Sequence, residues 1–209
     1  IEMAESLYIN CGACIRAWPS GLITKRDVEG EIIARTFSPT YWGDLWSSNW
    51  VRSELAADLY DEILFNDATF SDLNTGDGPL ILASATDIST GARLVFDQDL
   101  FDSMCSDLGT VRLSRAAAAS SAVPVVLSPV TLNNYGGTCD YRVPPVLSLF
   151  SGSTGSMRTA ERAKREIDER LAFADGKHCP YIHLVDGGVS DNVGMRSVIL
   201  VLELMEVAR

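Results

Sequence analysis

The sequence predicts an α/β protein, and three observations support this fold class. Residues 181–185 form a short apolar strand that ends in Asp186, Gly187 and Gly188. Residues 193–207 are apolar on nearly every side, as in a helix buried within a larger body. The 209 residues, 46% hydrophobic and 22% charged, match ordinary globular usage and can bury one core. A strand, a glycine turn and a buried helix form half of a parallel βαβ unit, so we expect parallel strands here.

Asp186 is the leading candidate for a functional residue. A carboxylate at the carboxyl end of a buried strand, on a turn that glycine forms easily, is where open α/β sheets place catalytic or ligand-binding groups. The same three residues, Asp186, Gly187 and Gly188, also fit a plain strand-to-helix turn in which the aspartate caps the next helix. Local sequence therefore leaves a catalytic and a capping interpretation open.

Two apolar helices are predicted in the first 130 residues, over the segment that begins at Ser53 and over 112–123. Ser53 can cap the first, in which Leu55, Leu59 and Ile63 recur every four residues and form an apolar stripe. Residues 112–123 predict a helix of small side chains that Pro124 stops. Small side chains let backbones approach closely, so this second helix should lie tight against another element.

Between these helices the pattern indicates a hairpin. Residues 80–85 predict a buried strand, Thr90 and Gly91 a turn, and residues 94–96 the hairpin partner or an edge strand. Residues 101–108 are expected to be helical.

The segment ahead of the Asp186 strand combines a long excursion and a charged helix. Residues 131–156 contain a proline pair and many turn-forming residues, which indicates a lid-like insertion. Residues 159–173 predict an amphipathic helix with Ala163, Ile167 and Leu171 on its apolar face. The following charged residues should pair on its solvated face: Glu161, Arg165 and Glu169.

The order and spacing of these segments resemble the second half of a patatin-like phospholipase domain. The resemblance is carried by residues 115–124, residues 127–130 and, some sixty residues later, the run 186–192. Residues 78–91 are similar to the strand and turn that precede the small-residue helix in that family, and the likeness covers about residues 27–205. It implies a three-layer α/β/α (flavodoxin-like) domain, incomplete at its N-terminal side. We therefore expect one partial domain over 1–209, with 1–26 unassigned.

The function that this resemblance implies is a lipid acyl hydrolase with a serine-aspartate dyad, acting on phospholipid or other lipid esters. Asp186 would be the general base, and Gly187 and Gly188 would shape its turn. Such chemistry needs neither metal nor cofactor. The two histidines of the chain, His178 and His183, are not required. His183 lies three residues before Asp186, so along an extended strand the two side chains point to opposite faces.

The chain departs from the family pattern at the nucleophile. No Gly-x-Ser-x-Gly elbow and no glycine-rich oxyanion loop occur, and Ser190 has a glycine two residues before it but none two residues after it. The chain begins at Ile1 and stops inside a helix-like run at Arg209. We therefore expect that the nucleophile half is missing and that this polypeptide alone is inactive.

Two alternatives remain beside the hydrolase. A noncatalytic lipid-binding or scaffold protein could use the same fold, and a Gly-x-Ser-x-Gly segment upstream of Ile1 would distinguish the enzyme from it. An unrelated flavodoxin-like ligand-binding domain would require a phosphate-cradling glycine loop at the start of a helix. The sequence contains no such loop.

The net charge and the hydropathy of the chain limit the classes of partner that it is expected to bind. The net charge of −11 and the pI near 4.5 argue against nucleic-acid binding. No apolar run approaches the ~20 residues of a membrane span, so we expect a soluble or peripherally bound protein. Trp42, Trp46 and Trp50 recur every four residues, and they either contact a bilayer interface or cover the core.

Cysteine spacing gives weaker indications. Cys11 and Cys14 have redox or half-zinc spacing but lack a second pair. Cys139 and Cys179 both lie in loop-like segments, and a disulfide between them is conceivable in an exported protein.

Overall fold

The computed structural model describes the following residues: 52–73, 81–124, 127–145, 147–148, 157–191, 195–196, 198–199 and 202. Trp42, Trp46, Trp50, Cys11 and Cys14 lie outside the described residues, so the predictions made for them stay predictions. Within the described part, no helix combines the length and apolarity that a membrane crossing needs.

Four antiparallel strands form the sheet of this mixed α/β chain. In the order β2-β1-β4-β3 they comprise Arg93–Val95, Ser84–Asp87, Tyr181–Asp186 and Val130–Asn133. β4 is central and runs antiparallel to both β1 and β3. The prediction of parallel strands is therefore wrong for the described sheet.

β4 runs antiparallel to β3 because of the connection between these two strands. Asn133, the last residue of β3, pairs with Tyr181, the first residue of β4. The chain between them leaves and re-enters the sheet at the same end, so the two strands must run in opposite directions. The predicted hairpin is confirmed, because β2 pairs antiparallel with β1 across a turn in which Gly91 has a φ of +73°.

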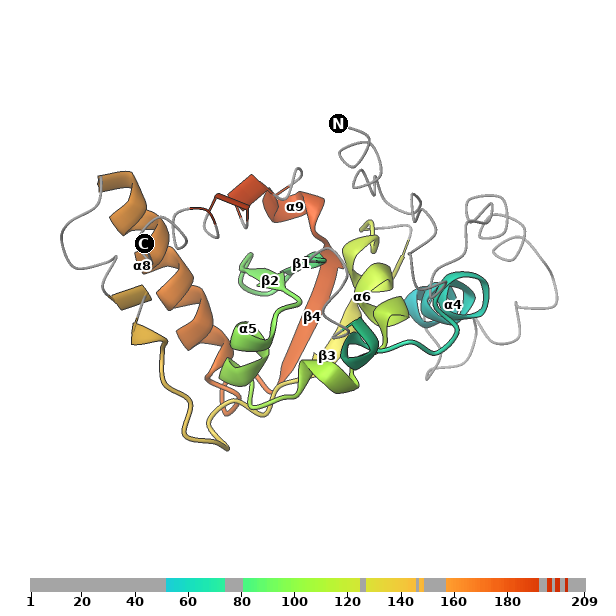
Figure 1. Cartoon of the computed structure of the whole chain (residues 1–209), viewed down its shortest axis with the longest axis horizontal. Coiled ribbons are helices and arrows are strands. Elements are labelled where there is room, and N and C mark those ends of the chain that lie inside the picture. The colour runs from blue at the N-terminus through green and yellow to red at the C-terminus, as the bar shows by residue number, and fades with distance from the viewer. Residues whose placement is uncertain are drawn as a thin grey trace.

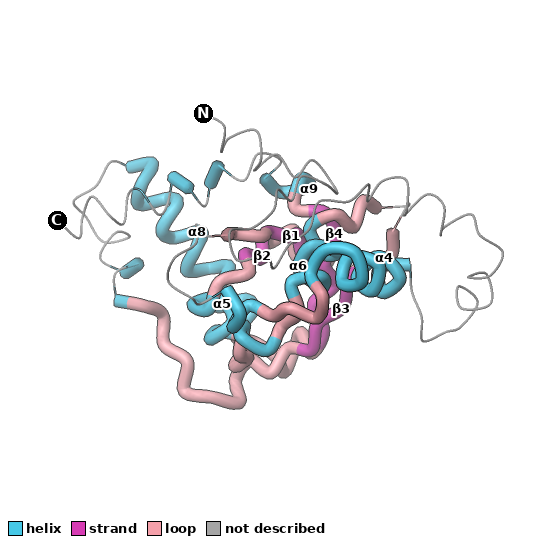
Figure 2. The backbone as a smooth tube through the Cα atoms, turned by 45° about the vertical axis from the view of Figure 1, so that its right-hand side comes forward, coloured by secondary structure: helices cyan, strands magenta, loops and turns pink. Residues whose placement is uncertain are grey.

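Helices lie on both sides of the sheet (Figures 1 and 2). On one side α6 packs against β1, β3 and β4, and α4 packs on α6, whereas α5 and α8 contact each other on the other side. The helical elements are α4 Arg52–Tyr60, η2 Asp61–Phe65, η3 Phe70–Leu73, α5 Gln98–Ser103, η4 Leu108–Thr110, α6 Leu113–Ser120, α8 Met157–Phe173 and α9 Gly188–Asp191.

The small-residue helix α6 forms the centre of the core. Ala118 and Ala119 are completely buried, and Ala122, just beyond the helix, is buried as well. The close approach predicted for this helix is confirmed, since α6 contacts the sheet directly. The stripe predicted for the first helix is also buried, at Leu55, Leu59 and Ile63. Ser53 lies inside α4 rather than at its cap, and its hydroxyl donates to the carbonyl oxygen of Ser128.

Helix α8 is present as predicted, but its buried face differs. Ala163 is buried, whereas Leu171 is 51% exposed, so the predicted apolar face is only partly correct. Glu166 and Arg170 turn inward instead, with side chains 13% and 7% exposed. These charges can be buried because Glu166 pairs with both Arg170 and Arg93 of β2.

The helix predicted over 193–207 is exposed where it is described. Residues 195–196, 198–199 and 202 are helical. Met195, Val198 and Leu202 are 49%, 45% and 58% exposed, so the predicted burial is wrong for these three side chains.

Cys139 forms its disulfide with Cys105 at the end of α5, while Cys179 is free and exposed. A Cys139–Cys179 bridge was the wrong pairing. The loop after β3 folds back toward α5 and brings the Cα atoms of Cys105 and Cys139 to 5.7 Å, a normal disulfide separation.

Candidate functional site

Asp186 ends the central strand of the sheet, as the sequence predicts. It pairs with Ala85 of β1, and its N–H donates to the carbonyl oxygen of Ala122 at 2.9 Å. The N–H of Gly187 donates to Ser120, the last residue of α6, at 3.4 Å. The half-buried Asp186 is therefore tied both to the sheet and to the end of α6.

The carboxylate of Asp186 makes a local capping contact. Its Oδ1 accepts a hydrogen bond of 2.6 Å from the N–H of Gly188, the first residue of α9. The capping geometry that the sequence left open is thus present. An ionised carboxylate has two oxygens and about four lone-pair sites, so a cap does not exhaust its accepting capacity.

Only glycine fits at position 187, because the main chain of Ser84 lies too close for a Cβ atom. A Cβ atom at this position would overlap the carbonyl oxygen of Ser84 and come within 2.9 Å of the Ser84 hydroxyl. Both atoms belong to β1, which cannot move without disturbing the ladder to β4. Close approach of backbones therefore explains the first glycine of the Asp-Gly-Gly turn.

Two hydroxyls that sequence reasoning missed lie under this turn. Thr86 of β1 is 2% exposed, and its Oγ1 lies 3.0 Å from the carbonyl oxygen of Asp186 and 2.9 Å from the Ser190 Oγ. A threonine in a strand is too common to stand out. Ser190 stands out in the sequence only as a serine that lacks the second glycine of a nucleophile elbow, which does not indicate this contact.

A buried ionic cluster lies beside the turn. We use this name for Arg93, Glu166, Arg170 and Asp191. Arg93 pairs with Glu166 at 3.3 Å and with Asp191 at 3.7 Å, and its side chain is only 5% exposed. The Asp191 carboxylate also accepts from the Arg196 N–H at 3.0 Å. A sequence signal existed, since Arg93 stands within an otherwise apolar run.

Burial near this cluster raises the pKa of two carboxyl groups, those of Glu169 and Asp97. Burial raises the pKa of Glu169 on α8, and the charge of Glu166 adds to the effect. Burial also raises the pKa of Asp97, although its carboxylate caps α5 by accepting from the Leu100 N–H at 2.8 Å. The environment on this side of the sheet thus opposes further negative charge.

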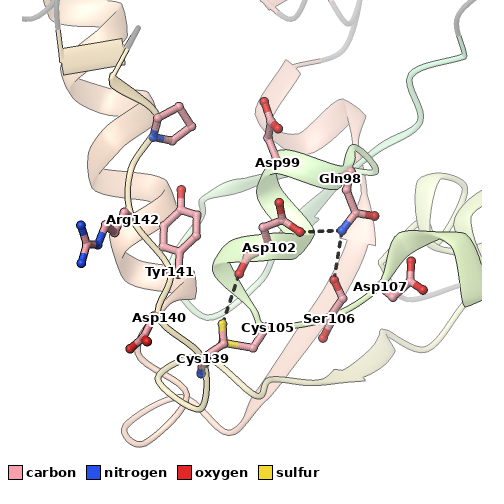
Figure 3. A pocket seen from close by; sticks show the side chains of 11 residues that line it. Gln98, Asp99, Asp102, Cys105, Ser106, Asp107, Cys139, Asp140, Tyr141 and Arg142 are labelled. Atoms are coloured by element: carbon pink, nitrogen blue, oxygen red, sulfur yellow. Dashed lines mark hydrogen bonds between the residues drawn. A yellow bond between two sulfur atoms is a disulfide. The ribbon is translucent and has the colours of Figure 1, made fainter.

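Asp186 does not line either of two cavities that the described residues form. The larger, of about 610 Å³, lies beside the disulfide (Figure 3) and is lined by acidic and polar side chains that include Asp99, Asp102 and Tyr141. The smaller, of about 250 Å³, is lined by both histidines. In the part of the chain that the structure describes, no group of three or more His, Cys, Asp or Glu side chains is arranged to hold a metal ion.

The histidines have partners away from Asp186. The Nδ1 of His183 lies 3.0 Å from the Thr131 hydroxyl on β3, as in a structural histidine. His178 lies 2.7 Å from a carboxylate oxygen of Asp175, and this contact lowers the pKa of Asp175. Neither contact joins a histidine to the Asp-Gly-Gly turn.

The site is therefore a single carboxylate at the end of a central β-strand, held by main-chain and hydroxyl hydrogen bonds. Comparison with known proteins adds nothing to this geometry: no family model matches the chain, and no curated protein or solved structure matches it.

Proposed function

We propose that this chain supplies the general base of a lipid acyl hydrolase that uses a serine-aspartate dyad, with Asp186 as the base. The observation that carries the proposal is the placement of Asp186 at the carboxyl end of the central strand, on a turn whose first glycine is sterically required. The sequence resemblance to patatin-like phospholipases supplies the reaction and the substrate class, phospholipid or another lipid ester.

The proposed reaction uses one carboxylate for two proton transfers in each of its two halves. The serine oxygen attacks the ester carbonyl carbon while its proton passes to Asp186, and the protonated Asp186 then gives that proton to the departing alcohol. Water attacks the resulting acyl-enzyme, Asp186 takes the proton of the water, and the serine recovers it as the acid leaves. The serine and the oxyanion donors are not among the residues that we assign in this chain.

The arrangement around Asp186 supports such a role in one respect. Its Oδ1 is fixed by the Gly188 N–H, so the carboxylate plane is held before any substrate arrives. A base oriented in advance contributes to rate because no reorganisation is needed in the transition state.

The capping bond also supports a second candidate, a noncatalytic lipid-binding or scaffold protein on the same fold. The 2.6 Å contact with Gly188 accounts for an aspartate at this position without any chemistry. The two candidates differ in what happens when the charge of Asp186 is removed and the cap is kept.

Asp186→Asn in the complete protein makes that distinction. Asparagine caps as well as aspartate but does not take a proton at neutral pH. We expect kcat for a lipid ester to fall by about 10²–10⁴-fold with an unchanged melting temperature. Asp107→Asn is the matched control, because Asp107 caps η4 by accepting from the Gly109 N–H at 2.8 Å. Activity of the Asp186→Asn protein within a few-fold of wild type would assign Asp186 to the cap alone.

A further inference from the structure

The hydroxyl of Thr86 lies directly under the Asp186 turn. Thr86 is in the middle of the sheet, where it pairs with Val185 of β4 and with Arg93 of β2. Its Oγ1 reaches the carbonyl oxygen of Asp186 and the Oγ of Ser190, so one side chain contacts both ends of the turn.

The direction of these hydrogen bonds follows from their donors and acceptors. A carbonyl oxygen only accepts, so Thr86 donates its single proton to the carbonyl of Asp186. The same hydroxyl also lies in donor position toward the Ser190 Oγ at 2.9 Å, so the Asp186 carbonyl oxygen and the Ser190 Oγ share its proton. The Ser190 hydroxyl donates to the carbonyl oxygen of Gly187 at 3.5 Å. These hydrogen bonds form a short chain from β1 to the carbonyl oxygens of Asp186 and Gly187.

This chain of hydrogen bonds fixes the peptide unit that carries the carboxylate. The carbonyl of Asp186 is held by Thr86, and the N–H of Gly187 in the same peptide plane is held by Ser120. The Gly188 N–H, one residue further along, then points at the Asp186 Oδ1. A rotation of that peptide plane would carry the Gly188 N–H away from the carboxylate.

Threonine suits this position better than other residues. A β-branched side chain has a restricted χ1 in a strand, so the hydroxyl direction is set before the turn forms. Valine has nearly the same shape but no hydroxyl, and serine keeps the hydroxyl with a freer χ1.

We propose that Thr86 and Ser190 are positioning residues that set the direction of the Asp186 carboxylate. A contribution of Thr86 and Ser190 to catalysis rests on the proposed function. Their effect on the direction of the Asp186 carboxylate does not depend on any reaction. The pair acts through the main chain of the turn and does not need to touch substrate.

The decisive measurement is NMR on the 209-residue chain. In Thr86→Val we expect the couplings that report χ1 of Asp186 to become averaged. We also expect the Gly188 amide to exchange with solvent at least about tenfold faster relative to the amides of β4, as for the loss of one supporting hydrogen bond. Thr86→Ser should behave as wild type. Thr110→Val is the matched control, since the Thr110 hydroxyl donates to the Asp107 carbonyl at 2.8 Å on the exposed η4.

Unchanged couplings and exchange in Thr86→Val would overturn the proposal, and so would a uniform rise in exchange over all β4 amides. If Thr86→Val does not fold, Ser190→Ala decides. It removes the second acceptor of the Thr86 hydroxyl and the donor to the Gly187 carbonyl oxygen, and the same local changes are expected in a weaker form. Wild-type behaviour of a folded Ser190→Ala would then count against the pair.

Kinetics of the complete protein separate this inference from the proposed function. We expect Thr86→Val to lower kcat by about 10–100-fold at an unchanged KM, and Thr86→Ser to restore it. Full activity of Asp186→Asn refutes the proposed function, and the NMR result then still decides whether Thr86 positions the carboxylate. Loss of activity in Asp186→Asn together with full activity in Thr86→Val refutes the positioning role alone.

Discussion

The Asp186 turn and the ionic cluster lie side by side and are held by different forces. The turn is fixed by hydrogen bonds from backbone groups and hydroxyls, among them Thr86 and the Gly188 N–H. The cluster is fixed by charge, with Arg93 between Glu166 and Asp191. They meet at α9, because Asp191 belongs to the cluster and its N–H also donates to the carbonyl of Gly187.

The difference lies in the kind of partner that holds each carboxylate. Buried carboxylates of the cluster are neutralised by arginine and serve packing. The Asp186 carboxylate, by contrast, accepts a hydrogen bond of 2.6 Å from a main-chain donor, the Gly188 N–H.

Removing the charge at the centre of the cluster should have the largest effect. In Arg93→Met, two carboxylates whose side chains are 13% and 9% exposed lose their shared cation. We expect the free energy of unfolding to fall by about 3–5 kcal/mol, measured by urea denaturation. Arg112→Met is the control, because Arg112 is 36% exposed and its pairing should contribute at most about 1 kcal/mol. An equal loss of unfolding free energy in both variants would show that burial does not increase the contribution of the Arg93 ion pairs to stability.

Filling the space at Gly187 tests the turn itself. Gly187→Ala places a methyl group against the main chain of Ser84, and we expect a loss of about 3 kcal/mol from overpacking. In Gly91→Ala the new methyl group meets no atom within 4 Å, so only the positive φ costs free energy, about 1–2 kcal/mol. A thermal or urea unfolding series compares the two. A smaller loss at Gly187 than at Gly91 would mean that β1 yields and that the turn is looser than its contacts indicate.

Short sequence patterns correctly predicted those elements whose packing depends on residues close to one another in the sequence. The β1-β2 hairpin follows from its turn at Thr90 and Gly91, and the stripe of α4 follows from a four-residue repeat. The tight helix α6 follows from its alanines. In each case the signal lies within about a dozen residues, which is the range over which hydrophobic periodicity is informative.

Features that depend on distant partners were mispredicted. The inward turn of Glu166 and Arg170 could not be read from α8 alone, because the cation that compensates Glu166 from outside the helix is Arg93, more than 70 residues earlier. The antiparallel direction of β4 depends on where the loop after Asn133 returns, and the disulfide depends on where that loop meets Cys105. For Asp186 the sequence correctly predicted the strand end and the capping contact, and its catalytic role stays a prediction. The supporting hydroxyl of Thr86 comes from a strand 100 residues away.

The smallest predicted effect is a pH dependence on the cluster side of the sheet. Burial raises the pKa of Asp97 above its ordinary value of 3.8, so the folded state holds this proton more tightly than the unfolded chain does. Below pH 3.8 the group is protonated in both states and has no effect. As the pH rises from there through the folded-state pKa, ionisation favours the unfolded chain and stability is lost. Asp97→Asn keeps the cap on α5 and removes this ionisation, so its stability relative to wild type should be greater at pH 7 than at pH 3.5. Urea denaturation at the two pH values measures the difference. The stability of Asp97→Asn relative to wild type could instead be the same at both pH values, or lower at pH 7. Either result would show that attraction to Arg170 outweighs burial, so that the charge of Asp97 stabilises the fold as the charges of the ionic cluster do.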